Sequence, residues 1–196
     1  NALEDYAGAI EDFDKAIEMK KAFMDDETCR MLIQNSDPQK VMIKHRDDFN
    51  FKGFNFSLSV RCKWDVWRND FGWGGDIKSI TATTQEQFEA AIRYFDYDRQ
   101  RAWYMDIAGS NRDVLIGISK KNFKIFKVFI NRDSDMYRSG LEKYSYLAFM
   151  YHNLNLAIST YNENHNMDIA SGISYKLPML KSDDWNDILN NISMVS

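Results

Sequence analysis

One stretch constrains the fold of this chain more than any other, because its side chains alternate in type from residue 54 to residue 66. The sequence there is FNFSLSVRCKWDV. Successive side chains of a β-strand point to opposite faces of the sheet, so this alternation predicts a long strand with one buried face. The residues of the predicted buried face are Phe54, Phe56, Leu58, Val60, Cys62, Trp64 and Val66.

A glycine-rich turn, NDFGWGG, and a returning strand, GDIKSI, follow this first strand. Clusters of Gly, Asn and Asp are typical of turns. Asp76 and Lys78 lie two residues apart and therefore share one face of the returning strand. Asp65 lies on the first strand, so pairing of the two strands brings three ionisable side chains toward one place.

The remaining patterns predict helices and strands on both sides of this hairpin. Helical spacing over residues 2–24 gives one apolar stripe, Asp25 or Asp26 caps a second helix to about Gln34, and VMIKH is a short strand. TATT caps a helix that breaks near residues 96–98, and a second helix ends at Gly109. The segments DVLIGIS and FKIFKVFI follow as a strand hairpin, then a long helix starts at Asp133 or Ser134, and WNDILNNI is a last short helix.

This order, α-α-β-β-β-α-α-β-β-α, predicts an α/β fold with a central mixed β-sheet flanked by helices. The length of 196 residues suits a single domain over residues 1–196. Within it we expect N-terminal helices over 1–35, a catalytic core over 40–130, and a C-terminal helix and tail over 134–196.

Composition narrows the class of protein. The chain has no apolar run of about 18 residues that would span a membrane. Its two isolated cysteines and 3 His offer no zinc or iron–sulfur cluster and fit a reduced, cytoplasmic compartment. A formal net charge of -4 argues against a surface coated for nucleic acid as a whole, but it leaves room for a local basic groove.

The three converging side chains suggest one chemistry. Two close carboxylates repel each other unless they bind a proton or a cation, and oxygen ligands select hard cations such as Mg²⁺ or Mn²⁺. Lys78 on the same strand would orient an attacking water, and the metal would polarise a phosphate. The alternative is that Asp65 is an ordinary edge-strand acid paired with Lys63 or Lys78, an interaction worth only about 0–1 kcal/mol.

Three segments in this order resemble the PD-(D/E)xK nuclease superfamily. They are KWDVW around Asp65, GDIKS around Asp76 and Lys78, and YDRQRAWYMDIAG around Gln100 and Tyr104. The nearest likeness is to the RecE-type and lambda-exonuclease-type phage recombination nucleases, whose helix before the catalytic sheet also resembles DYAGAIEDFDKAIEMKKA. The resemblance covers residues 4–160.

The resemblance implies a site and an activity. Asp65, Asp76 and the backbone carbonyl of Ile77 would bind Mg²⁺ or Mn²⁺, Lys78 would be the catalytic lysine, and Gln100 and Tyr104 would face the site. The activity would be exonucleolytic hydrolysis of double-stranded DNA ends in phage-type recombination. A homo-oligomeric ring and a single-strand annealing protein would be the expected assembly and partner.

One feature of these nucleases is missing from the chain. RecE-type proteins carry an earlier helix with a Gly-x-x-x-His box, and related nucleases use a Glu there. The chain begins after the place where that box would lie, so we expect either a fragment or a weakened site. Glu4, Glu11 and Glu18 on the first helix are the candidate substitutes.

Basic and aromatic residues surround the predicted site. Those expected to track DNA phosphates, unless they are merely solvated, are Arg61, Lys63, Arg68, Arg93, Arg99 and Arg101. Phe71 and Trp73 in the turn either cover the core edge or stack on a DNA end. Two other functions stay open: an endonuclease of the same fold, and a DNA-binding or assembly protein that is non-catalytic or weakened.

Overall fold

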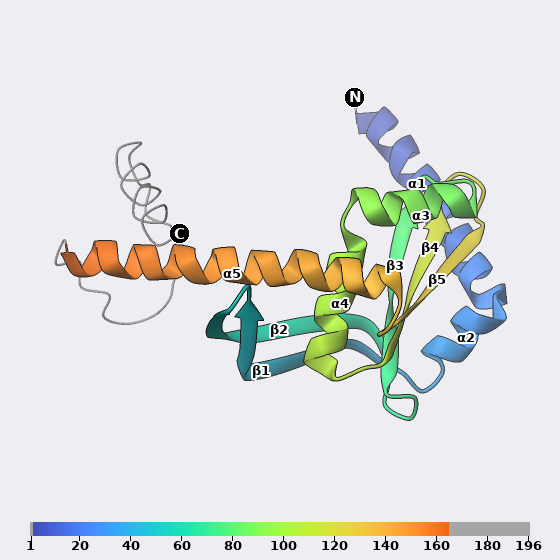
Figure 1. Ribbon diagram of the computed structural model, residues 1–196. Helices are drawn as coiled ribbons and strands as arrows, with labels where there is room; N and C mark the ends of the chain where they lie inside the picture. The colour runs from blue at the N-terminus through green and yellow to red at the C-terminus, as the bar shows by residue number, and fades with distance from the viewer. Residues whose placement is uncertain (1, 165–196) are drawn as a thin grey trace. The chain divides into compact units, whose positions relative to one another are not determined.

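The computed structural model describes residues 2–164 (Figure 1). The chain divides into two compact units, one of residues 1–47 and 59–144, the other of residues 48–58 and the chain from 145 onward. The predicted short helix WNDILNNI lies outside the described residues, and the prediction of one domain over 1–196 stays a prediction.

The order of helices and strands is the predicted one, α-α-β-β-β-α-α-β-β-α. The bounds are α1 Ala2–Asp25, α2 Glu27–Ile33, β1 Asp37–Phe51, β2 Phe54–Arg68, β3 Trp73–Ile80, α3 Gln85–Tyr94, α4 Tyr97–Ala108, β4 Arg112–Ser119, β5 Ile125–Asn131 and α5 Asp135–Asn164. None of the helices in the described part of the chain is long and apolar enough to cross a membrane.

The strands form one five-stranded sheet in the order β1-β2-β3-β4-β5. Strand β3 pairs antiparallel with β2 and parallel with β4, and β4 pairs antiparallel with β5. A parallel neighbour requires a crossover connection, and helices α3 and α4 provide it. The predicted α/β class with a mixed central sheet is therefore confirmed.

Local capping explains where three helices begin or end. The Asp26 side chain accepts a hydrogen bond from the Cys29 N–H at the start of α2, and Thr84 caps α3 in the same way. Gly109 ends α4 with φ 66°, in the left-handed region that glycine enters without strain. Asp26 is one of the two predicted caps, Thr84 is the last residue of the predicted TATT cap, and Gly109 was predicted to end its helix.

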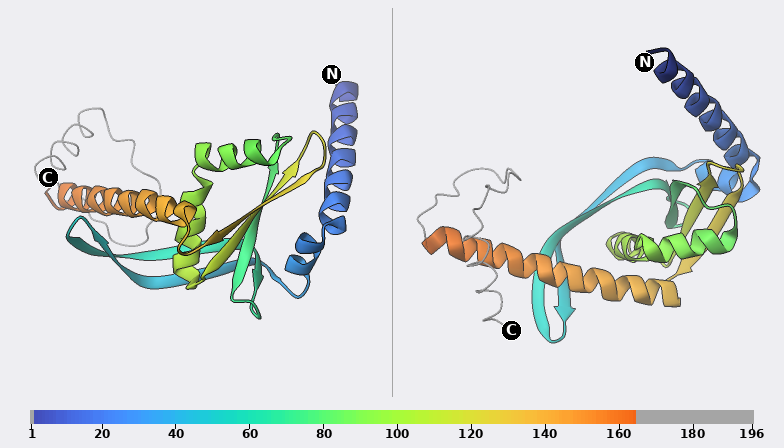
Figure 2. Two further views of the ribbon diagram at one scale, coloured as in Figure 1. Left: turned by 45° about the vertical axis from the view of Figure 1, so that its right-hand side comes forward. Right: turned by 90° about the horizontal axis from the view of Figure 1, so that it is seen from above.

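Helices cover both faces of β3 and β4, with α1 and α2 on one side and α3 on the other (Figure 2). On one face, Phe23 of α1 and Leu32 of α2 belong to a cluster with residues of β2 and β4. On the other face, α3 approaches so closely that a Cβ on Gly117 would lie 2.8 Å from the Phe88 ring. This close approach explains a glycine in the middle of an otherwise apolar strand.

The second unit holds the tip of the β1–β2 hairpin and the later part of α5. Its contacts are aromatic: the rings of Phe51 and Phe149 lie 5.1 Å apart, and those of Phe56 and His152 lie 4.9 Å apart. Offset aromatic pairs of this kind stabilise a small contact area.

Several details differ from the sequence prediction. Strand β1 is longer than VMIKH and runs to Phe51. Phe54, predicted to be buried, is 54% exposed. Regular alternation would place Trp64 and Trp67 on opposite faces of β2. Their rings nevertheless touch, with centroids 4.9 Å apart, so the alternation breaks between them. The apolar stripe of α1 is also open to solvent, with Phe13 66% exposed.

Candidate functional site

Asp65 lies at the point where β2 parts from β3. The register of the two strands pairs Val66 with Gly75 and continues toward the turn. One residue beyond this ladder, Asp65 Oδ2 accepts a hydrogen bond of 2.9 Å from the Ile77 N–H. Its Oδ1 accepts a longer one of 3.3 Å from Gln39 Nε2. The Asp65 carboxylate therefore takes the place of a backbone carbonyl as the hydrogen-bond acceptor of Ile77, the residue that follows Asp76 in the chain.

The glycines of the turn allow this close approach. A Cβ on Gly74 would lie 2.2 Å from the Val66 carbonyl oxygen, and one on Gly75 would lie 2.8 Å from Val114 Cγ1. Gly72 has φ 67°. Gly72 is thus required by backbone conformation, whereas Gly74 and Gly75 are required by packing.

Asp76 is nearly buried, with 3% of its surface exposed. Its Oδ2 lies 2.7 Å from Lys78 Nζ and its Oδ1 lies 3.2 Å from Arg101 Nη1. The Lys78 side chain is 24% exposed, and its Nζ lies 5.0 Å from the centre of the Tyr97 ring. The structure thus brings Asp76 and Lys78 together, as predicted, and adds a second cation.

That second cation, Arg101, has no exposed surface. Its Nε donates a hydrogen bond of 2.6 Å to Asp113 Oδ2, and its guanidinium lies 4.6 Å from the Trp64 ring centre and 4.7 Å from that of Tyr104. Burial raises the pKa of Asp113 to about 6, against the opposing charge of Arg101. Arg101 was predicted to contact DNA, but in this structure it is not placed to do so.

Gln100 and Tyr104 lie one turn apart on α4. The Tyr104 ring contacts Trp64, with centroids 5.7 Å apart. Three buried atoms have no hydrogen-bond partner within residues 2–164: Gln100 Oε1, Trp64 Nε1 and Arg101 Nη2. Asp76 Oδ2 is also without a well-oriented hydrogen bond, although Lys78 Nζ is near it. Three unsatisfied polar atoms from β2 and α4, beside an Asp76 oxygen that has only an ion pair, thus mark this part of the fold.

The other predicted basic residues divide into two groups. Arg61, Lys63 and Arg93 are exposed, and Arg99 lies 3.9 Å from Asp96. Arg68 is buried, and its Nε and Nη2 donate to the two oxygens of Asp70 at 2.8 and 2.6 Å. Its predicted position facing DNA is therefore not the one observed.

The turn aromatics pack together. The rings of Phe71 and Trp73 are stacked with centroids 5.6 Å apart, and the Arg68 guanidinium lies 3.9 Å from the centre of the Phe71 ring. Trp73 also packs against the core cluster under α2. Its contact with the core supports the first of the two predicted roles, covering the core edge.

Sequence reasoning missed Asp113 and Gln39. Asp113 begins the strand segment DVLIGIS, and a lone acid before a fully apolar strand is the signal that could have indicated a buried partner. Gln39 has φ 53°, and nothing in its sequence surroundings indicates contact with Asp65.

A divalent cation can be tested against this donor set. Mg²⁺ is commonly held by one or two carboxylates together with waters and phosphate oxygens, and Asp65, Asp76 and the Ile77 carbonyl fit that pattern. No group of three His, Cys, Asp or Glu side chains that could hold a metal occurs within the described residues. Of the candidate extra ligands, Glu11 is ion-paired with Lys15 at 2.6 Å and Glu18 is exposed; the Glu4 side chain lies outside the described part.

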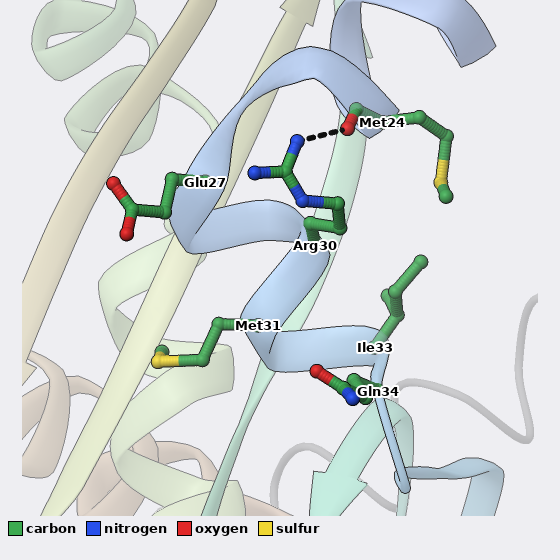
Figure 3. A pocket seen from close by; sticks show the side chains of 6 residues that line it. All are labelled: Met24, Glu27, Arg30, Met31, Ile33 and Gln34. Carbon is green, nitrogen blue, oxygen red and sulfur yellow. Dashed lines mark hydrogen bonds between the residues drawn. The ribbon is translucent and has the colours of Figure 1, made fainter.

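A separate pocket of ≈ 610 Å³ lies at the end of α1 and along α2 (Figure 3). Arg30 Nη1 donates to the Met24 carbonyl at 2.9 Å across its edge. The lining residues are Met24, Glu27, Arg30, Met31, Ile33 and Gln34. None of them belongs to the predicted site.

Comparisons with known proteins give distant similarities. No protein family matches the sequence, and no curated protein matches it. A solved structure of a phage-related exonuclease from Haemophilus somnus 129PT is similar with TM-score 0.40 and 11% sequence identity, covering 72% of this chain and 74% of that one. The structure of the protein SSO0001 has TM-score 0.39 and 13% identity, covering 58% of this chain and 50% of that one, so the match spans half of SSO0001. These values carry no conclusion about what this chain does.

Proposed function

We propose that this chain is a Mg²⁺- or Mn²⁺-dependent nuclease that hydrolyses phosphodiester bonds at the ends of double-stranded DNA. One arrangement carries the proposal. The Asp65 carboxylate is bound to the backbone of Ile77 at 2.9 Å, and the residues on either side of Ile77 form an ion pair of 2.7 Å. A carboxylate from β2 is thus bound to the strand residue that separates Asp76 from Lys78, which supports a shared site for the three side chains.

Asp65, Asp76 and the Ile77 carbonyl would hold the cation. The N–H and C=O of one strand residue point to the same side of the strand, so the Ile77 carbonyl lies on the side of Asp65. When bound, a divalent cation polarises the scissile phosphate and acidifies the attacking water.

Lys78 and α4 would supply the remaining contacts. The Lys78 ammonium, whose side chain is 24% exposed, would orient the attacking water and balance negative charge that develops on the phosphate. The Gln100 and Tyr104 side chains would hold the phosphate or Lys78. Among the described residues, Gln100 Oε1 has no hydrogen-bond donor, so it is available to accept a hydrogen bond from Lys78.

Exposed basic residues on β2 would guide the duplex. Arg61 and Lys63 precede Asp65 on the same strand and are both exposed, so phosphate contacts there would lead toward the site. Preference for DNA ends, a ring assembly and an annealing partner rest on the resemblance to phage recombination nucleases alone.

A cleavage assay tests the proposal. The wild-type chain should degrade linear duplex DNA only when Mg²⁺ or Mn²⁺ is present and should spare closed circular DNA. Lys78→Met should abolish degradation while the circular-dichroism spectrum is unchanged, and Lys21→Met, an exposed lysine on α1, should have no effect. Full activity of Lys78→Met would refute the site, and cleavage of closed circles would indicate an endonuclease.

A second function is favoured by one observation. Both oxygens of Asp76 are already ion-paired, with Lys78 and with Arg101, and this compensation opposes metal uptake. The chain would then be a DNA-binding or assembly protein without turnover. Calorimetric titration with Mn²⁺ separates the two functions, because duplex binding without metal uptake or cleavage is the result expected of the second.

A further inference from the structure

The Asp76 carboxylate is held by two cations that differ in mobility. Lys78 reaches Oδ2 with a flexible side chain that is partly exposed, whereas Arg101 reaches Oδ1 with a guanidinium that has no exposed surface. Arg101 is also bound to Asp113 at 2.6 Å, and its guanidinium contacts the rings of Trp64 and Tyr104 at 4.6 and 4.7 Å from their centres. Of the two, Lys78 is the one free to move when a cation approaches.

We propose that Arg101 is a positioning residue, which fixes one oxygen of Asp76 so that the other oxygen is presented to Lys78 and to a divalent cation. The proposal rests on the proposed function. It also explains why an arginine inside the fold bridges two acids from neighbouring strands, β3 and β4, which a point-like lysine ammonium would not do with the same geometry.

Charge alone would predict the opposite effect, since a cation beside a metal ligand repels the metal. Asp113 offsets this repulsion, because its distance to Arg101 is 2.6 Å and the distance from Asp76 to Arg101 is 3.2 Å. The opposite charges of Arg101 and Asp113 therefore largely cancel, so the pair exerts little net electrostatic repulsion on a cation bound by Asp76. Orientation of the Asp76 carboxylate is the effect that remains, and loss of such an outer contact weakens metal affinity by about 10- to 100-fold in known sites.

The test removes the pair together. Arg101→Met with Asp113→Asn keeps the net charge, leaves no unpaired buried ion from the pair, and retains an oxygen that can accept the hydrogen bond Asp113 now takes from the Val114 N–H. Its matched control is Asp98→Asn with Lys143→Met, which removes an ion pair of 2.9 Å between α4 and α5 that does not involve Asp76 or Lys78. Mn²⁺ affinity of the full chain is measured by calorimetry, with circular dichroism as the check of folding.

We expect Mn²⁺ affinity to fall at least tenfold in the Arg101/Asp113 variant and to stay within about twofold of wild type in the control, as expected when an outer contact is lost only in the first. If the double variant does not fold, Arg101→Lys replaces it in the experiment. The same loss of Mn²⁺ affinity is expected, because one ammonium cannot bind both Asp76 and Asp113 in the geometry of the guanidinium. Wild-type or tighter affinity in the folded variant would overturn the positioning role. Absence of Mn²⁺ uptake by the wild-type chain would instead overturn the proposed function, and this inference with it.

Discussion

Asp65 has a structural and a proposed chemical role, and two substitutions separate them. Asp65 Oδ2 accepts the Ile77 N–H at 2.9 Å at the place where the β2–β3 ladder ends. Asp65→Ala removes this acceptor, and the loss of a hydrogen bond to a charged group costs about 1.5–3 kcal/mol. Asp65 is only half-buried, so we expect the lower part of this range. Asp65→Asn keeps an amide oxygen in place, and its cost should stay below about 1 kcal/mol.

Urea denaturation followed by circular dichroism measures the stability effect, and degradation of linear duplex with Mg²⁺ measures the chemical one. Asp65→Asn should abolish cleavage although it is nearly as stable as wild type, because the amide lacks the negative charge of the carboxylates through which Mg²⁺ is usually bound. Equal destabilisation by Asn and Ala would refute the structural role assigned to Oδ2. Wild-type cleavage by Asp65→Asn would refute its role as a ligand.

Three further outcomes concern stability. Gly74→Ala should destabilise the fold by about 1–3 kcal/mol or more, because the added Cβ would lie 2.2 Å from the Val66 carbonyl oxygen; urea midpoints check this. Burial raises the pKa of Asp113 from 3.8 to about 6. Between these two pH values the folded state keeps a proton that the unfolded state releases, so Asp113 makes the free energy of unfolding fall as pH rises from about 4 to about 6. Asp113→Asn should therefore give a more positive slope of unfolding free energy against pH than wild type between pH 4 and about 6, and an unchanged slope would contradict the assigned burial effect. Phe13→Ser, at a 66% exposed position, should change stability by less than about 0.5 kcal/mol, whereas Leu32→Ala in the core should cost about 2–5 kcal/mol in the same denaturation experiment.

The order and type of the helices and strands could be predicted because each follows from a local pattern. Asp26, Thr84 and Gly109 act within one turn of a helix, and alternation over β2 correctly indicated burial of Val60 and Trp64. Such signals depend on neighbouring residues alone, so a single sequence contains them.

Features set by contacts distant in sequence were missed. The break in alternation between Trp64 and Trp67 depends on how β2 meets β3, which period-two reasoning does not contain. Arg101 was expected to contact DNA phosphates or solvent, but the fold buries it against Asp76 and Asp113, and full burial is rare for an arginine. The amphipathic pattern of α1 likewise indicates a helix, but it does not state how much of the stripe the rest of the chain covers.

The Asp76 carboxylate, bound between Lys78 and Arg101, is the group on which the proposed metal-dependent cleavage of DNA depends most. The most direct test is single-turnover degradation of a linear duplex with Mg²⁺, comparing the wild-type chain with Asp76→Asn. We predict cleavage by the wild type that stops when the cation is chelated, and none above background by the variant. Equal cleavage by the two proteins would contradict this role of Asp76.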